Sequence, residues 1–216
     1  MQSFKINRFA IPATERHSDA MNGLQRLLKR TFDISFSFMG LIVFSPFLLI
    51  FSVVLLFDKG PVIFKQERIG YQGKPFFIYK FRSMRVDSES NGIPRTEQER
   101  NKHITPFGNF LRAHHLDELP QLWNILKGDM SFVGPRPERQ YFIDQINRET
   151  DEYHFIYQMR PGLTSYATIH NGYTDNMDKM LKRLDYDLDY LDNRSLMMDM
   201  SIIVKTVWSV FTGKKI

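Results

Sequence analysis

The sequence predicts a mainly helical α+β fold, in which a broken apolar helix near the N-terminus precedes a polar, basic domain. Three observations favour this fold class. Residues 34–57 carry no charge, two short β-type runs follow them, and stretches with apolar residues at helical spacing make up most of the remainder. We therefore expect a loose arm over residues 1–20, the broken helix with its basic flank over residues 21–58, and one further domain over residues 59–216.

Composition limits the classes of function. The 216 residues suffice for one domain with a buried core. There is no cysteine, which excludes disulfides, thiolate metal sites and cysteine nucleophiles. A net charge of +5 indicates an anionic partner, which is nucleic acid, anionic lipid or a phosphorylated substrate. The 19 Phe residues are concentrated in the apolar run, and this favours lipid.

Residues 1–20 show neither helical nor strand periodicity and contain Pro12 among mixed charges. We expect them to form a loose arm, which is either an extension before Met21 or a start-site artefact. They do not begin a signal peptide, because the apolar run that follows is too long and lacks a small-residue cleavage site.

The apolar run of residues 34–57 is about the ~20 residues that cross the hydrocarbon core of a bilayer. Ser45 and Pro46 interrupt it, and the proline removes the hydrogen bond to the Ile42 carbonyl and bends the helix. Basic residues flank the run at both ends: Arg26, Lys29 and Arg30 before it, and Lys59, Lys65 and Arg68 after it. Because Lys and Arg prefer the cytoplasmic side, we expect a re-entrant helix rather than a spanning one, held to the membrane surface by its flanks.

Residues 62–64 and 76–81 read as two short strands, and Gly70 and Gly73 punctuate the link between them. We expect a small β-hairpin. Its polar residues are mostly basic and alternate with Phe and Tyr; they are Lys65, Arg68, Lys74, Lys80, Arg82 and Arg85. This pattern is typical either of a surface on which nucleic-acid bases stack or of a solvated basic face beside a membrane, and the second is favoured for most of these residues.

Residues 88–106 are polar and predict a loop or short helix, and a helical stretch over residues 106–119 follows. It contains the adjacent pair His114 and His115. Neighbouring histidines point to different faces of a helix, so the pair has poor metal-ligand spacing and we expect it to be structural or supporting.

Residues 116–138, LDELPQLWNILKGDMSFVGPRPE, hold the densest group of acidic, basic, Gly and Pro residues. Asp117 fits a helix N-cap, Pro120 fits the first turn, and Gly128 fits the end of the helix. Asp117 and Glu118 then lie at the positive end of a short helix, where phosphate binds readily. A divalent metal best reconciles two adjacent carboxylates, and Mg²⁺ prefers one or two carboxylates plus substrate phosphates. The alternative is a plain helix cap followed by a first-turn charge.

The same stretch ends in a stiff loop, in which Arg136 stands between Pro135 and Pro137. A guanidinium held in this way can bind phosphate through two N–H groups or stack on a base. The alternative is that the Pro-Arg-Pro segment is only a surface turn. Beyond the loop, residues 139–157 predict one amphipathic helix. The apolar run of residues 202–211 is too short to span a membrane and fits a core or membrane-interface helix.

Taken as a whole, the string of residues 116–138 resembles the signature of the bacterial sugar transferases, monotopic phosphoglycosyltransferases that start glycan assembly on polyprenol phosphate. The resemblance runs from about Met21 to the C-terminus and includes the string KQERIG, the string QGKPF and a helix broken at Ser-Pro. The chain departs from the family pattern at residues 113–115, and again over residues 165–173, a loop that bears on sugar selection. Because no transmembrane bundle precedes the apolar helix, the chain resembles the small, minimal members.

The resemblance implies a role for each matching residue. Asp117 would be the nucleophile and Glu118 the Mg²⁺ ligand, and Pro135, Arg136 and Pro137 would bind the nucleotide. Lys80, Arg82 and Arg112 would line the phosphate site. The implied reaction moves a sugar-1-phosphate from a UDP-sugar to undecaprenyl phosphate through an aspartyl-phosphosugar, releasing UMP at the cytoplasmic face of a bacterial inner membrane. Membrane lipids and downstream glycosyltransferases are then the expected partners, and nucleic acid is not.

Two other interpretations remain at this point. The chain can be a non-catalytic, membrane-anchored protein whose basic face holds anionic partners. It can also be a transferase that works through a direct ternary complex, with Asp117 only as a metal ligand. The long signature, the broken apolar helix and the basic flanks together favour the covalent enzyme.

Overall fold

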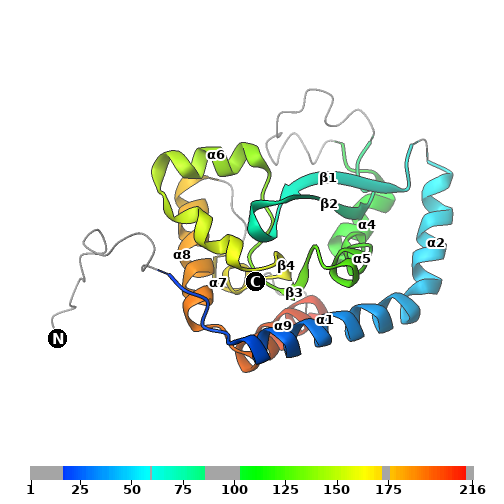
Figure 1. Cartoon of the computed structure of the whole chain (residues 1–216). Helices are drawn as coiled ribbons and strands as arrows, with labels where there is room; N and C mark the ends of the chain where they lie inside the picture. The colour runs from blue at the N-terminus through cyan, green and yellow to red at the C-terminus, as the bar shows by residue number, and fades with distance from the viewer. Residues whose placement is uncertain (1–16, 59, 86–102, 172–175, 213–216) are drawn as a thin grey trace.

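The computed structural model describes residues 17–58, 60–85, 103–171 and 176–212 (Figure 1). In this part of the chain the fold is mainly helical, with one antiparallel and one parallel two-stranded sheet. The mainly helical α+β prediction is confirmed. The predicted polar segment at 88–106 and the predicted arm at 1–20 fall largely outside the described residues, as does Lys59.

The apolar segment forms two helices, α1 (Gly23–Val43) and α2 (Ser45–Leu56), that meet at an angle of 59°. Asn22 and Gln25 form a capping box that begins α1. At the bend, Pro46 has no N–H, and the Ser45 hydroxyl instead donates to the Ile42 carbonyl at 2.7 Å. The predicted break at Ser45 and Pro46 is confirmed. No single described helix is long and apolar enough to cross a bilayer, whereas the bent pair meets that requirement by length and composition.

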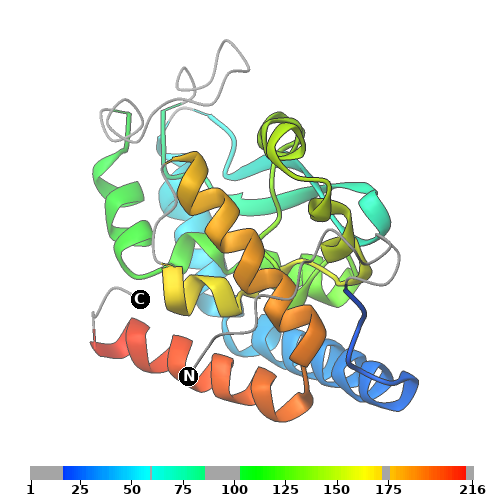
Figure 2. The same cartoon turned by 90° about the vertical axis from the view of Figure 1, so that its left-hand side faces the viewer.

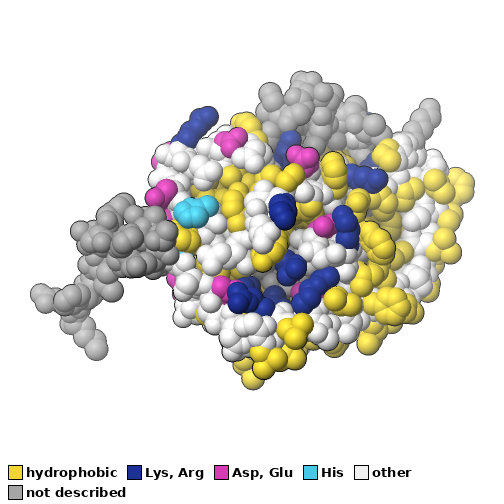
Figure 3. Space-filling view, viewed as in Figure 1, with side chains coloured by type: hydrophobic (Ala, Val, Ile, Leu, Met, Phe, Trp, Pro, Cys, Tyr) yellow, Lys and Arg dark blue, Asp and Glu magenta, His cyan; other side chains and the backbone are white. Residues whose placement is uncertain are grey.

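The outer surface of α1 and α2 is apolar and exposed. It includes Leu24, Leu27, Leu28, Phe36, Phe38, Met39, Ile42, Phe47, Leu49, Ile50, Leu56 and Phe57. Figure 3 shows this hydrophobic surface along the right-hand and lower edges of the molecule. Only a few side chains of α2 turn inward, and Phe51 and Leu55 pack there against Phe81 and Leu111. The helix pair therefore presents to its surroundings a surface that soluble domains normally bury.

The predicted β-hairpin is confirmed. Strands β1 (Ile63–Ile69) and β2 (Pro75–Phe81) pair antiparallel, from Ile63 opposite Phe81 to Ile69 opposite Pro75, and the 3₁₀ turn η3 (Tyr71–Gly73) joins them. The first strand is longer than its predicted range of 62–64. Its polar second half carries no apolar alternation, and backbone pairing with β2 extends it.

The stretch with the acidic pair folds as α4 (Pro106–Ala113), the 3₁₀ turn η5 (Leu116–Glu118) and α5 (Gln121–Lys127). Asp117 is therefore not an N-cap, which corrects the prediction. His115, at φ 55° and ψ 19°, reverses the chain after α4, and the 3₁₀ turn occupies the residues before Pro120. Gly128, at φ 104°, ends α5 as predicted.

Next comes β3 (Ser131–Val133), which pairs in parallel with β4 (Gly162–Thr164). The single helix predicted over residues 139–157 is wrong: the segment forms α6 (Gln140–Glu149) and the 3₁₀ helix η6 (Glu152–Gln158). Extended backbone at Thr150 ends α6, and the Thr150 hydroxyl accepts the Glu152 N–H at 3.2 Å. Local capping thus overrides the apolar period.

The chain continues through α7 (Tyr166–Asn171), α8 (Met177–Asn193) and α9 (Leu196–Thr212). The largest core cluster joins β3, α6, η6, α8 and the inner side of α9. Figures 1 and 2 show α9 beside α1 along one side of the molecule. The outward side of α9 exposes Met197, Val204, Val207 and Trp208, so the two helices continue one apolar surface.

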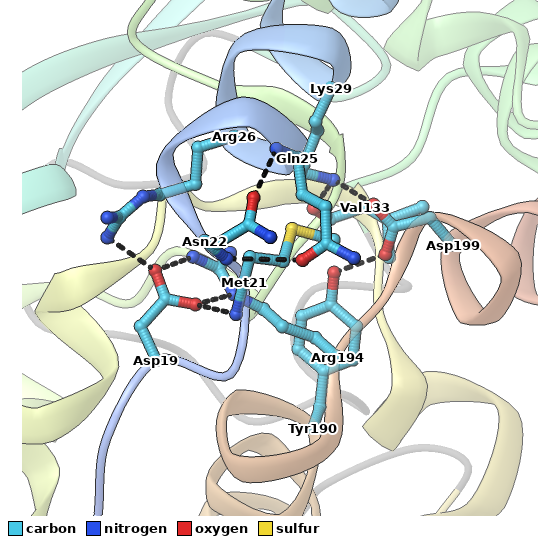
Figure 4. Close-up of polar contacts among 10 residues, drawn as sticks. All are labelled: Asp19, Met21, Asn22, Gln25, Arg26, Lys29, Val133, Tyr190, Arg194 and Asp199. Atoms are coloured by element: carbon cyan, nitrogen blue, oxygen red, sulfur yellow. Dashed lines mark hydrogen bonds and ion pairs between the residues drawn. The ribbon is translucent and has the colours of Figure 1, made fainter.

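The described end of the predicted arm is held in place. The His17 ring contacts Asp192 at 2.6 Å, and the Ala20 N–H donates to the Leu191 carbonyl at 3.1 Å. Asp19 receives the guanidinium of Arg194, as Figure 4 shows. Residues 17–20 therefore connect the start of α1 to the end of α8.

Candidate active site

The carboxyl group of Asp117 is buried, with the residue 8% exposed, on the short turn between α4 and α5. Within the described residues no side chain or backbone group makes a hydrogen bond or ion pair with it. Burial raises the pKa of Asp117, and the neighbouring charge of Glu118 adds to that rise. Lys80 and Arg112 lower the pKa only in part. The fold thus keeps this carboxylate poorly solvated and without a partner among the described residues.

Glu118 has the opposite surroundings. Its Oε1 accepts from Lys80 Nζ at 2.5 Å. Burial acts to raise the pKa of Glu118, yet the charges of Lys80 and Arg136 outweigh it and hold the pKa below its ordinary value. Glu118 is therefore ionised at neutral pH, and the two adjacent carboxyl groups differ sharply in environment.

The position of Lys80 depends on Asn124, a residue to which the sequence patterns assign no role. Asn124 is fully buried on α5, where its Oδ1 accepts from the Tyr79 N–H at 3.0 Å and its Nδ2 donates to the Phe77 carbonyl at 2.7 Å. These bonds attach α5 to the strand that carries Lys80. The available signal is an amide inside an otherwise apolar helical run, because a buried amide requires partners.

The Pro-Arg-Pro loop places Arg136 in solvent between the buried Pro135 and Pro137. The loop is held by the segment around Gly162, whose N–H donates to the Pro135 carbonyl at 2.9 Å. The two backbones approach so closely that a Cβ on Gly134 would lie 2.1 Å from the Arg160 carbonyl oxygen, so the position requires glycine. Arg136 makes no hydrogen bond or ion pair with the described residues. Its charge nevertheless lowers the pKa of Glu118, so it belongs to the same site.

The other predicted cations divide into two groups. Arg112, in the last turn of α4, acts on the pKa of Asp117 and has no ion-pair partner in the described chain. Arg82 is 5% exposed, and its guanidinium donates to the carbonyls of Leu55 and Asp58 at 3.3 and 3.1 Å. It therefore binds the C-terminal end of α2, where the carbonyls lack helical partners, and its predicted place at the phosphate site stays a prediction.

The two histidines follow α4 directly and make local contacts. His114 Nδ1 lies 2.9 Å from the Phe110 carbonyl, and the ring packs on Phe110. His115 adopts the left-handed conformation that turns the chain toward Asp117. That backbone conformation is uncommon outside glycine, and it occurs directly before Leu116 and the acidic pair.

A small cavity lies behind the Pro-Arg-Pro loop, lined in part by Arg136, Glu138, Arg183 and Asp187. Glu138 pairs with Arg183 at 2.7 Å. One carboxylate oxygen of the buried Asp187 has no hydrogen-bond partner among the described residues. Burial raises the pKa of Asp187 to about 7, against the attraction of Arg183. Two acidic groups thus share one guanidinium behind the loop.

The sequence of the chain matches those of known proteins. The model of the bacterial sugar transferase family matches residues 24–213. The chain belongs to that family.

Three relatives carry more specific names. A UDP-N-acetylgalactosamine-undecaprenyl-phosphate N-acetylgalactosaminephosphotransferase of Aeromonas hydrophila is 38% identical over 187 residues, which are 86% of this chain and 44% of the relative. A UDP-glucose:undecaprenyl-phosphate glucose-1-phosphate transferase of Escherichia coli (strain K12) is 38% identical over 207 residues, 94% of this chain and 44% of the relative. The chain spans less than half the length of these two relatives.

The third relative is of similar size to this chain. The Exopolysaccharide production protein PSS of Rhizobium leguminosarum bv. phaseoli is 41% identical over 199 residues, which are 88% of this chain and 98% of the relative.

The acidic pair of this bacterial sugar transferase has the chemistry of a partial magnesium site. Mg²⁺ commonly binds one or two carboxylates and takes its other ligands from water and substrate phosphates. Asp117 and Glu118 are adjacent, and no cluster of three or more His, Asp or Glu residues occurs in the described ranges. The carboxylates present are of the ligand type that Mg²⁺ takes, and a magnesium site here stays a prediction.

Proposed function

We propose that this protein transfers a sugar-1-phosphate from a UDP-sugar to undecaprenyl phosphate, giving undecaprenyl-diphospho-sugar and UMP. The observation that carries the proposal is the Asp117 carboxyl, buried and without a partner in the described chain, with the charges of Lys80 and Arg112 acting on it and that of Arg136 acting on the adjacent Glu118. The names of the relatives from Aeromonas and Escherichia describe the same reaction class.

In the first step a carboxylate oxygen of Asp117 attacks the phosphorus nearer the sugar. The bond from that phosphorus to the bridging oxygen breaks, UMP leaves with the electron pair, and an aspartyl-phosphosugar remains. Because the carboxylate is poorly solvated and has no partner to release, little reorganisation opposes the attack.

In the second step an oxygen of undecaprenyl phosphate attacks the same phosphorus. The bond to Asp117 breaks, the carboxylate is restored, and the sugar phosphate is joined to the lipid phosphate. One carboxyl group can thus serve a substrate in water and a substrate in the membrane in turn.

Three cations of the chain stabilise the phosphates. Lys80 is held beside Glu118 at 2.5 Å, so its charge is fixed at the site. Arg112 and Arg136 have no ion-pair partner in the described part and are available for the diphosphate and the nucleoside. Figure 3 shows Lys and Arg side chains gathered in the middle of this face. When bound through Glu118, Mg²⁺ would neutralise charge on the diphosphate and the leaving UMP.

The bent pair α1 and α2 supports a reaction at a membrane. Its outer surface is apolar, its two helices meet at 59°, and α9 extends the exposed apolar side chains. A helix pair that enters and leaves on the cytoplasmic face of a bacterial inner membrane would bring the lipid phosphate to the surface where Asp117 lies.

The test is UMP release by the detergent-purified protein with Mg²⁺ and a panel of UDP-sugars, with and without undecaprenyl phosphate. We expect lipid-dependent turnover of one sugar nucleotide, and exchange of labelled UMP into that UDP-sugar without lipid. Turnover without such exchange would support the direct ternary-complex reaction. If no UDP-sugar is consumed, the enzyme interpretation fails and a non-catalytic basic membrane protein takes its place.

A further inference from the structure

We propose that Lys29, Arg30 and Asp33 of α1 act as positioning residues for the transfer reaction. They bind the two segments that lead to the acidic pair and to the Pro-Arg-Pro loop, and we call them the α1 clamp. The inference rests on the proposed function for its kinetic test but not for its structural one.

Asp33 holds strand β3. The residue is 2% exposed, and its Oδ1 accepts hydrogen bonds from the Ser131 hydroxyl and the Phe132 N–H, both at 3.1 Å. β3 ends at Val133, directly before Gly134 and the Pro-Arg-Pro loop. The carboxylate therefore fixes the strand from which the loop departs.

Lys29 holds the end of the same strand. Its Nζ donates to the Val133 carbonyl at 2.9 Å and to Asp199 at 2.5 Å (Figure 4). Asp199 in turn accepts from the Tyr190 hydroxyl at 2.5 Å. Because Asp199 lies on α9 and Tyr190 on α8, the ammonium joins α1, β3 and the C-terminal helices at one point.

Arg30 holds the end of α5. Its Nη1 and Nη2 donate to the carbonyls of Ile125 and Leu126 at 2.7 and 2.9 Å. These carbonyls lie in the last turn of a helix, where partners are missing and cations are favoured. A Cβ on Gly128 would come within 3.2 Å of Arg30 Nη2, so the glycine also leaves room for the guanidinium.

The α1 clamp thus sets the spacing between the two halves of the site. α5 is short and begins just after the Asp117–Glu118 turn, so fixing its far end limits the movement of that turn. Fixing β3 limits the Pro-Arg-Pro loop. The sequence predicts Lys29 and Arg30 as a basic flank at the membrane surface, which the structure corrects: both turn inward to carbonyls, while Arg26 remains 55% exposed in its side chain.

The experiment compares Asp33→Ala with Asp33→Asn and uses Ser35→Ala, an exposed position on the same helix, as the control. Alanine removes the acceptor for both β3 donors, whereas asparagine keeps an oxygen there. The readouts are kcat and KM for the UDP-sugar, vesicle flotation, thermal unfolding, and hydrogen exchange of peptides covering residues 117–119 and 134–138.

We expect Asp33→Ala to raise KM, to lower kcat, and to lose about 10²-fold in kcat/KM, since a misplacement near 1 Å can have this effect. We also expect faster exchange at both peptides and unchanged flotation. Asp33→Asn stays within about threefold of the parent, because an acceptor shape is retained. Exchange does not depend on activity, so it tests the α1 clamp even if no UDP-sugar is turned over.

Three results would overturn the α1 clamp. Unchanged exchange at both peptides in Asp33→Ala is one. A kcat that falls only in proportion to the folded fraction, with the parental KM, is another, since that reports stability alone. An Asp33→Asn variant as impaired as Asp33→Ala is the third. A parent that is inactive with every UDP-sugar contradicts the proposed function instead.

Discussion

Asp33 and Asp117 are both buried aspartates, yet their surroundings differ completely. Asp33 lies on α1 and accepts two hydrogen bonds at 3.1 Å from β3. Asp117 lies on a 3₁₀ turn and has no hydrogen-bond or ion-pair partner in the described chain. The Asp33 carboxylate fastens α1 to β3, whereas the Asp117 carboxylate makes no such structural contact in the described chain.

The difference between the two aspartates indicates how the buried charged groups of this protein can be divided by function. A buried charge without a partner is costly, and a fold retains it where something else uses the group. A buried charge whose bonds are all made within the protein contributes to position and stability. By this criterion Asp117 is a candidate for the reaction and Asp33 belongs to the framework. The half-buried Arg112 and the exposed Arg136, which have no ion-pair partner in the described chain, are candidates beside Asp117, whereas the guanidinium of Arg82 binds the end of α2.

The most severe test replaces Asp117 by asparagine. We expect UMP release to fall by at least about 10³-fold, because loss of a nucleophile removes the reaction path. Thermal stability should stay equal or rise, since the substitution removes a buried charge beside Glu118 and breaks no bond in the described chain. Intact-mass analysis of the parent with UDP-sugar should show a sugar-phosphate adduct that the variant lacks. Parental turnover in Asp117→Asn would invalidate the division between the two aspartates.

Arg136→Ala tests whether a cation without an ion-pair partner in the described chain binds the substrate. We expect KM for the UDP-sugar to rise about 10- to 100-fold, as for loss of a charge-assisted contact, with little change in unfolding temperature. Arg148→Ala, an exposed arginine on α6, is the matched control and should leave KM unchanged. Equal KM values for the two variants would remove Arg136 from the site.

Asp187 gives a pH-dependent prediction. Its pKa of about 7 lies above that of an unfolded aspartate, so the folded state binds the extra proton and its stabilisation is lost as pH rises from about 4 through 7. Asp187→Asn should abolish this loss, and its free energy of unfolding at pH 8 should be higher than that of the parent by roughly 2–4 kcal/mol. Unfolding temperatures measured at pH 5, 6.5 and 8 check it. A variant and parent with parallel pH profiles would show that this carboxyl does not titrate as its burial indicates.

Arg82→Lys has the smallest expected effect and tests whether Arg82 contributes to stability rather than to substrate binding. Lysine keeps the charge but not the fork that reaches the carbonyls of Leu55 and Asp58, so we expect about 1–2 kcal/mol less stability. KM for the UDP-sugar should not change. A raised KM at parental stability would return Arg82 to the phosphate site that the sequence predicts for it.

The sequence predicts much of the fold because several local rules agree. The Ser45-Pro46 break, the hairpin punctuated by Gly70 and Gly73, and the end of α5 at Gly128 each follow from backbone chemistry that acts within a few residues. The errors occur where tertiary or capping contacts override a local pattern. The helix predicted over residues 139–157 is divided at Thr150, and the helix predicted from Asp117 begins at Gln121.

The sequence by itself determined the family, the broken apolar helix, and the residues that carry charge at the candidate site, because motif spacing and composition are properties of the chain. Only the tertiary structure decided which of those charges remain unpaired. The partners of Arg82, Arg30 and Asp33 come from segments about 24 to 99 positions away, and no local pattern encodes such pairing. A charge gains its role from the groups that reach it in the folded state, since desolvation and hydrogen bonding are fixed only there.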